Sequence, residues 1–112
     1  MARYWSADGV RNTPPDYVEI VWDHDTGGYE WSVIAFLRRP RGAEWEYAAY
    51  NDSGCSCNYA YEDAPKSCDL DWTPSVAVAV YRTNAMIDKS YDLDGPERID
   101  AKAKLRAAVE AM

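Results

Sequence analysis

The feature that most constrains the fold of this chain is a run of three strand-like segments joined by short turns. Residues 17–23 and 44–51 largely alternate apolar and polar side chains, and residues 29–38 are apolar on both faces of a two-residue period. All three segments are rich in β-branched and aromatic residues, which is typical of strands. The turns between them, residues 25–28 and 39–42, contain glycine, which supplies the positive φ of a tight connection. Strands joined so closely are antiparallel neighbours. The sequence therefore predicts a three-stranded antiparallel meander.

The faces of the predicted strands indicate which strand is central. By the two-residue period, the first strand carries Val18, Ile20 and Trp22 on one face. The second strand carries apolar residues on both faces: Trp31, Val33, Ala35 and Leu37 on one, and Ile34 and Phe36 on the other. We therefore expect the second strand to lie in the middle of the sheet. The Arg-Pro-Arg-Gly turn at 39–42 is expected to be basic and exposed.

The residues after the sheet predict a helix over 75–89. Thr73-Pro74 is typical of a helix start, with threonine as the N-cap and proline at the first helical position. Valines and alanines alternate over residues 75–83, and that alternation also allows a strand. The length of the segment and its alanines favour the helix.

A second helix is predicted at the C-terminal end. Gly95-Pro96 opens it, and one helical face then carries Ala101, Leu105, Ala108 and Met112. Together the elements predict a single α+β domain over residues 1–112, with the two C-terminal helices packed on one face of the sheet. Residues 1–16 are expected to form an irregular lead-in, and residues 51–72 a cysteine-containing loop.

Charge and apolar patterning exclude several classes of partner. The net charge of −7 argues against nucleic-acid binding, which needs Lys and Arg to displace counterions, and against an anionic membrane surface. No apolar run is long enough to span a bilayer, and Met1 does not lead into the apolar region of a secretion signal. Three cysteines, an odd count, favour a reducing cytoplasm over a secreted disulfide framework.

The cysteines Cys55, Cys57 and Cys68 allow three interpretations. As thiolates they could bind zinc, with His24 or an acid as the fourth ligand, although their spacing departs from the usual C-x₂₋₄-C pair. As reactive thiols they lack the C-x-x-C motif, and a Cys–His pair would need His24 close to the end of the third strand. As small apolar residues they would anchor a long loop. The sequence favours this last interpretation, so we expect no cofactor, with zinc as the alternative.

Two further groups of titratable residues have plain structural interpretations. His24 lies between Asp23 and Asp25 beside a turn, where a solvated hairpin residue is favoured over an imidazole tuned by carboxylates. Acids gather at Glu62, Asp63, Asp69 and Asp71 without the spacing of a calcium loop. No catalytic constellation is recognised, so we predict no catalytic residue, and the sequence leans against an enzyme.

Residues 52–57, D-S-G-C-S-C, are the most distinctive segment of the chain. A tryptophan-rich meander, this segment, an acidic loop and a helix start near Thr73 together resemble a family of small actinobacteriophage proteins. The likeness covers about the middle half of the chain. It implies a phage-encoded protein located in the cytoplasm of a bacterial host, and it carries over no catalytic residue.

The aromatic composition favours a binding role. The chain has five Trp and nine Tyr but one Phe, and Trp and Tyr give rigid contact area that is partly apolar and partly polar. We expect a small acidic, non-enzymatic protein-binding module acting on a host or phage protein. Tyr59 and Tyr61 would contact the partner, and Glu62 and Asp63 would steer a basic surface. The alternatives are a zinc- or thiol-dependent protein centred on the cysteines, and a structural virion component.

Overall fold

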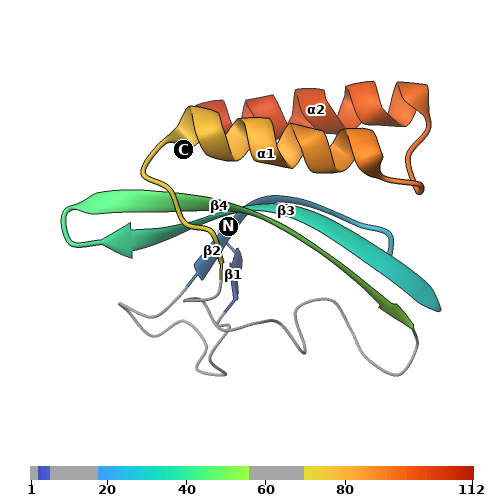
Figure 1. Ribbon diagram of the computed structural model, residues 1–112, viewed down its shortest axis with the longest axis horizontal. Helices are drawn as coiled ribbons and strands as arrows, with labels where there is room; N and C mark the ends of the chain where they lie inside the picture. The colour runs from blue at the N-terminus through green and yellow to red at the C-terminus, as the bar shows by residue number, and fades with distance from the viewer. Residues whose placement is uncertain (1–2, 6–17, 56–69) are drawn as a thin grey trace.

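The computed structural model describes residues 3–5, 18–55 and 70–112, and its strands form one open antiparallel sheet (Figure 1). In sheet order the strands are β1 (Arg3–Trp5), β2 (Val18–Asp25), β3 (Glu30–Arg41) and β4 (Glu44–Cys55). The helices α1 (Val76–Lys89) and α2 (Gly95–Glu110) lie side by side over one face of this sheet. The predicted α+β fold, a meander followed by two C-terminal helices, is confirmed. The short strand β1 is added to it, within the segment expected to be irregular.

The hairpin of β3 and β4 is longer than the sequence predicted. The register runs from Arg41 opposite Glu44 to Glu30 opposite Cys55, so β4 extends four residues beyond the predicted end at residue 51. Residues 39–41 also belong to β3, and the turn is made at Gly42, which has a φ of 61°. Backbone pairing continues for as long as a partner strand is available, even where Asp, Ser and Gly have low strand propensity.

The prediction that Val18, Ile20 and Trp22 share one face of the first strand is wrong, because β2 contains a β-bulge at Val21. Ile20 lies opposite Leu37 and Trp22 lies opposite Phe36, so Val21 is the additional residue between them. A bulge shifts the following residues to the other face of the pleat. Trp22 therefore packs beneath the helices, whereas Ile20 points to the opposite face. The alternating pattern alone could not reveal this change.

Both faces of the sheet are buried. The helix-side cluster consists of Trp22, Ile34, Phe36, Ala79, Ile87, Leu93, Ala101 and Leu105. The second cluster, on the opposite face, consists of Val18, Ile20, Trp31, Val33, Ala35, Leu37 and Tyr50, with Leu70 and Trp72 packed against it. Consecutive residues of β3 thus belong to different clusters, as expected for a central strand.

Caps define the starts of both helices. The Ser75 side chain accepts a hydrogen bond from the Val78 amide at 3.2 Å, so Ser75 is the N-cap of α1 and the prediction of Thr73 is wrong. Asp94 and Glu97 form a capping box at the start of α2. Within the described residues, neither helix combines the length and the apolar character needed to cross a membrane.

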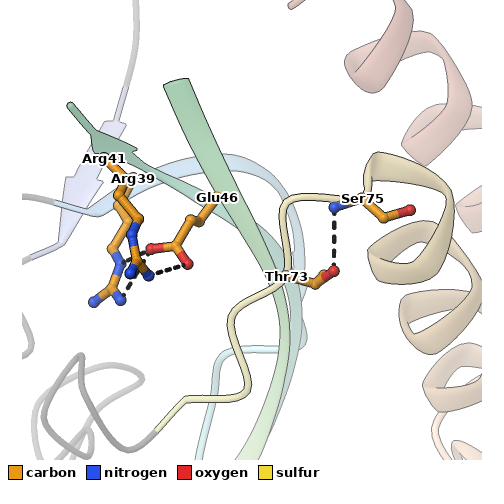
Figure 2. A network of polar contacts seen from close by, with 5 residues as sticks. All are labelled: Arg39, Arg41, Glu46, Thr73 and Ser75. Carbon is orange, nitrogen blue, oxygen red and sulfur yellow. Dashed lines mark hydrogen bonds and ion pairs between the residues drawn. The ribbon is translucent and has the colours of Figure 1, made fainter. Parts of the chain in front are cut away.

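Thr73 has a different role from the one predicted for it. Its backbone forms an antiparallel bridge with Tyr47 of β4, through hydrogen bonds of 2.8 and 2.9 Å. Its side-chain hydroxyl accepts a hydrogen bond from the Ser75 amide at 3.1 Å (Figure 2). Thr73 therefore connects the edge of the sheet to the first turn of α1.

Substitution of Phe36 and Leu37 tests whether both faces are buried. Both side chains are fully buried, on opposite faces of β3. We expect Phe36→Ala to lower the free energy of unfolding by about 3–5 kcal/mol and Leu37→Ala by about 2–5 kcal/mol, measured by urea denaturation. Ile99→Ala, at a position that is 72% exposed, serves as the control and should change it by less than about 0.5 kcal/mol. A neutral Leu37→Ala would show that the second face is open.

Candidate functional site

A groove opens where the β3–β4 hairpin leaves the C-terminal end of α1. Its volume is about 710 Å³, and its walls come from the start of β3, the end of β4 and the segment that joins α1 to α2. The lining residues are Ser32, Val33, Ile34, Asn51, Asp52, Ser53, Met86, Lys89, Ser90, Tyr91 and Asp92. Figure 1 shows the two strands curving away from the helices at this end of the molecule.

A hydrogen bond between distant segments fixes the groove. The Ser32 hydroxyl of β3 donates to the Asp92 carboxylate at 2.5 Å, which ties the α1–α2 connection to the sheet. Beside this contact, Tyr91 is fully exposed at the rim (103%). Tyr29, which is 79% exposed, immediately precedes β3 at the same end of the sheet. Tyr91 at the rim and Tyr29 at the same end of the sheet are therefore aromatic side chains that the fold does not bury.

The Asp52 carboxylate lies at the outer edge of β4. Its Oδ1 atom accepts a hydrogen bond from the Ser53 amide at 2.8 Å, and its Oδ2 atom accepts one from the Tyr50 hydroxyl at 2.9 Å. Burial of Tyr50, this hydrogen bond and the negative charge of Asp52 all raise the pKa of the phenol. The neutral hydroxyl thus remains a donor that orients the carboxylate, and a carboxylate keeps acceptor capacity beyond two hydrogen bonds.

A second polar group, at the opposite end of the hairpin, has a structural role. Glu46 is only 6% exposed and accepts hydrogen bonds from Arg39 Nε at 3.2 Å and from Arg41 Nη1 at 2.9 Å (Figure 2). The Arg39 guanidinium also lies 4.3 Å from the ring centroid of Trp72, a cation–π distance. These charges satisfy one another, and they hold the segment before α1 against the hairpin.

The structure keeps His24 and Cys55 apart. His24 lies opposite Ile34 and Cys55 lies opposite Glu30, on the two strands that flank β3. Four residues along a strand correspond to about 13 Å, whereas zinc ligands lie about 2.0–2.3 Å from the ion. His24 is therefore not placed to complete a zinc site at Cys55. Among residues 3–5, 18–55 and 70–112, no three His, Cys, Asp or Glu side chains gather around a common point.

The other predicted site residues lie outside the part of the chain that the structure describes. These are Cys57, Cys68, Tyr59, Tyr61, Glu62 and Asp63. The cysteine site and the tyrosine–acid contact surface therefore stay predictions. The groove was missed from the sequence because residues 51–72 were assigned to a loop, whereas residues 51–55 belong to β4 and line the groove in part. A signal was present in Ser90-Tyr91-Asp92, which puts an aromatic residue in a polar connection.

Comparison with known proteins gives no relative for this chain. No family model matches it, and neither do the curated proteins or the solved structures.

Alkaline stability tests the environment of Tyr50. An unfolded tyrosine ionises near pH 10, whereas the folded protein raises the pKa of Tyr50. Below pH 10 both states keep the proton. Above it the unfolded state loses the proton first, so the free energy of unfolding falls as pH rises. We expect this fall between pH 10 and 11 to be shallower in Tyr50→Phe than in wild type, by urea denaturation. Parallel curves would contradict the assignment.

Substitution of Glu46 tests whether its ion pairs with Arg39 and Arg41 stabilise the fold. Glu46→Ala leaves the partly buried Arg39 without its acceptor, and we expect it to lower the free energy of unfolding by about 1–3 kcal/mol. Glu44→Ala is the matched control, because Glu44 is an exposed acid on the same face of β4. That control should change stability by less than about 0.5 kcal/mol. Equal effects of the two substitutions would exclude a stabilising role for the network.

Proposed function

We propose that this chain is a small, acidic, non-enzymatic protein-binding module whose partner docks at the groove. The observation that carries the proposal is the open groove of about 710 Å³ with fully exposed Tyr91 at its rim. Tyrosine supplies a large contact area at a small loss of side-chain entropy, which makes it common at binding surfaces. A partner that covers the rim would bury Tyr91 and reach the apolar floor.

The charge of the chain supports a basic partner. A net charge of −7 attracts a cationic surface and speeds its association, while it disfavours acidic competitors. The D-S-G-C-S-C segment, residues 52–57, supports a phage-encoded protein that acts on a host or phage protein. Tyr59, Tyr61, Glu62 and Asp63 follow this segment in the chain, and they remain the contact residues proposed from the sequence.

Site-specific photocrosslinking tests the proposal. A photoreactive phenylalanine analogue placed at Tyr91 should give a discrete adduct with one protein in an actinobacterial lysate. The same analogue at Tyr81 is the matched control, because Tyr81 is 75% exposed but lies on α1 and does not line the groove. We expect the Tyr91 adduct to exceed the Tyr81 adduct at least tenfold.

Two outcomes would count against this function. Equal adducts from both positions would indicate non-specific contact, and the absence of an adduct from either would leave the groove without a protein partner. A third placement, at Tyr59, examines the contact surface predicted from the sequence. An adduct from Tyr59 alone would keep the binding function but move its site away from the groove.

A further inference from the structure

Hydrogen-bonding groups of β4 face outward along one side of the groove. β4 is the last strand in the sheet order, and Tyr47 directs its amide and carbonyl away from β3, to Thr73. Because backbone groups alternate in direction along a strand, Ala49, Asn51 and Ser53 point the same way. The Ser53 amide is bonded to Asp52. For the outward groups of Ala49 and Asn51, the described part of the chain provides no partner.

From this edge we infer that β4 binds an extended peptide segment of a basic partner protein, which adds a strand to the sheet at Ala49–Ser53. The inference rests on the protein-binding function proposed above and specifies how the partner is held. In strand addition, backbone hydrogen bonds provide affinity and alternate side chains provide specificity. The added strand would continue the ladder that Thr73 begins at Tyr47.

Within residues 3–5, 18–55 and 70–112, the edge of β4 at Ala49–Ser53 lacks most of the features that block strand addition. Proteins protect exposed edges with proline, lysine, bulges or a covering segment. Ala49, Asn51 and Ser53 have small side chains without charge, and β4 pairs with β3 without a register shift along this stretch. The Asp52 carboxylate accepts a hydrogen bond from one outward amide, that of Ser53, and so makes this amide unavailable to an added strand. A cationic ligand would be attracted to that carboxylate.

The two sides of the added strand would meet different chemistry. On the groove side, Ile34 and Met86 provide an apolar floor. The positive charge of Lys89 and the negative charge of Asp92 cancel there, so this side has no net charge from the two residues. The other side faces Asp52, which lines the groove from the β4 strand and whose hydrogen-bond donors, the Tyr50 hydroxyl and the Ser53 amide, are both neutral. The favoured segment therefore alternates apolar residues, directed into the groove, with Lys or Arg directed toward Asp52.

Electrostatic repulsion disfavours a second copy of this chain at the β4 edge, in comparison with a basic peptide segment. Pairing of two β4 edges would bring together two Asp52 carboxylates and two chains that each carry a net charge of −7. Like charges placed across a pairing interface are destabilising. A basic segment relieves this repulsion, so a different protein is favoured over self-association.

Selection from a displayed library of random linear peptides tests the inference on the intact chain. We expect enriched peptides to alternate apolar and basic residues. Asn51→Pro removes the outward amide without removing a bond to β3, and it should weaken binding of the selected peptides at least tenfold by fluorescence polarisation. Asn51→Ala is the matched control and should bind within twofold of wild type. Asp52→Asn should weaken binding and reduce its dependence on salt.

A measurement on the wild-type chain guards against misfolding of the proline variant. Selected peptides should slow amide hydrogen exchange at Ala49 and Asn51, because strand addition places both amides in hydrogen bonds. Three results would overturn the inference: no enriched peptide, binding without protection of these amides, or a wild-type dimer in light scattering that Asn51→Pro dissociates. A Tyr91 crosslink together with any of them would leave the binding function standing and exclude only strand addition.

Discussion

The ladder between β3 and β4 extends from the Arg41–Glu44 pair to the Glu30–Cys55 pair, and both hydrophobic clusters are built on it. Consecutive β3 residues supply side chains to opposite faces, so one register error would exchange the two clusters. The same register places Arg39 opposite Glu46 at the turn end, and Ser32 opposite Ser53 beside the groove. Pairing of these two strands therefore positions the structural ion pairs and the candidate site together.

The sequence correctly predicted the features of the fold that depend on the local period of apolar residues. Apolar residues on both faces of residues 29–38 identified the central strand, and Ala101 and Leu105 identified the buried face of α2. Features that depend on tertiary context were missed. The bulge at Val21 reverses a face without any change in composition, and pairing with β3 overrides the weak strand propensity of residues 52–55.

The candidate site was harder to predict than the fold, because it depends on which backbone groups have no partner among the described residues of the folded chain. Asn51 is an ordinary polar residue in the sequence, and its importance follows from the direction of its amide at the outer side of β4. The edge is occupied by Thr73 at Tyr47 and by the Asp52 carboxylate at Ser53. The segment between these two points is short enough to limit uncontrolled sheet-to-sheet association and long enough for a short ladder.

The Tyr47–Thr73 bridge attaches the chain just before α1 to a defined position on β4. With Thr73 held by Tyr47, Ser75 capping α1 and Trp72 against Arg39, the docking of the helices is set by residues after the connection. An insertion or deletion within residues 72–75 would therefore move both helices relative to the sheet, because these four residues link the hairpin contacts directly to the first turn of α1.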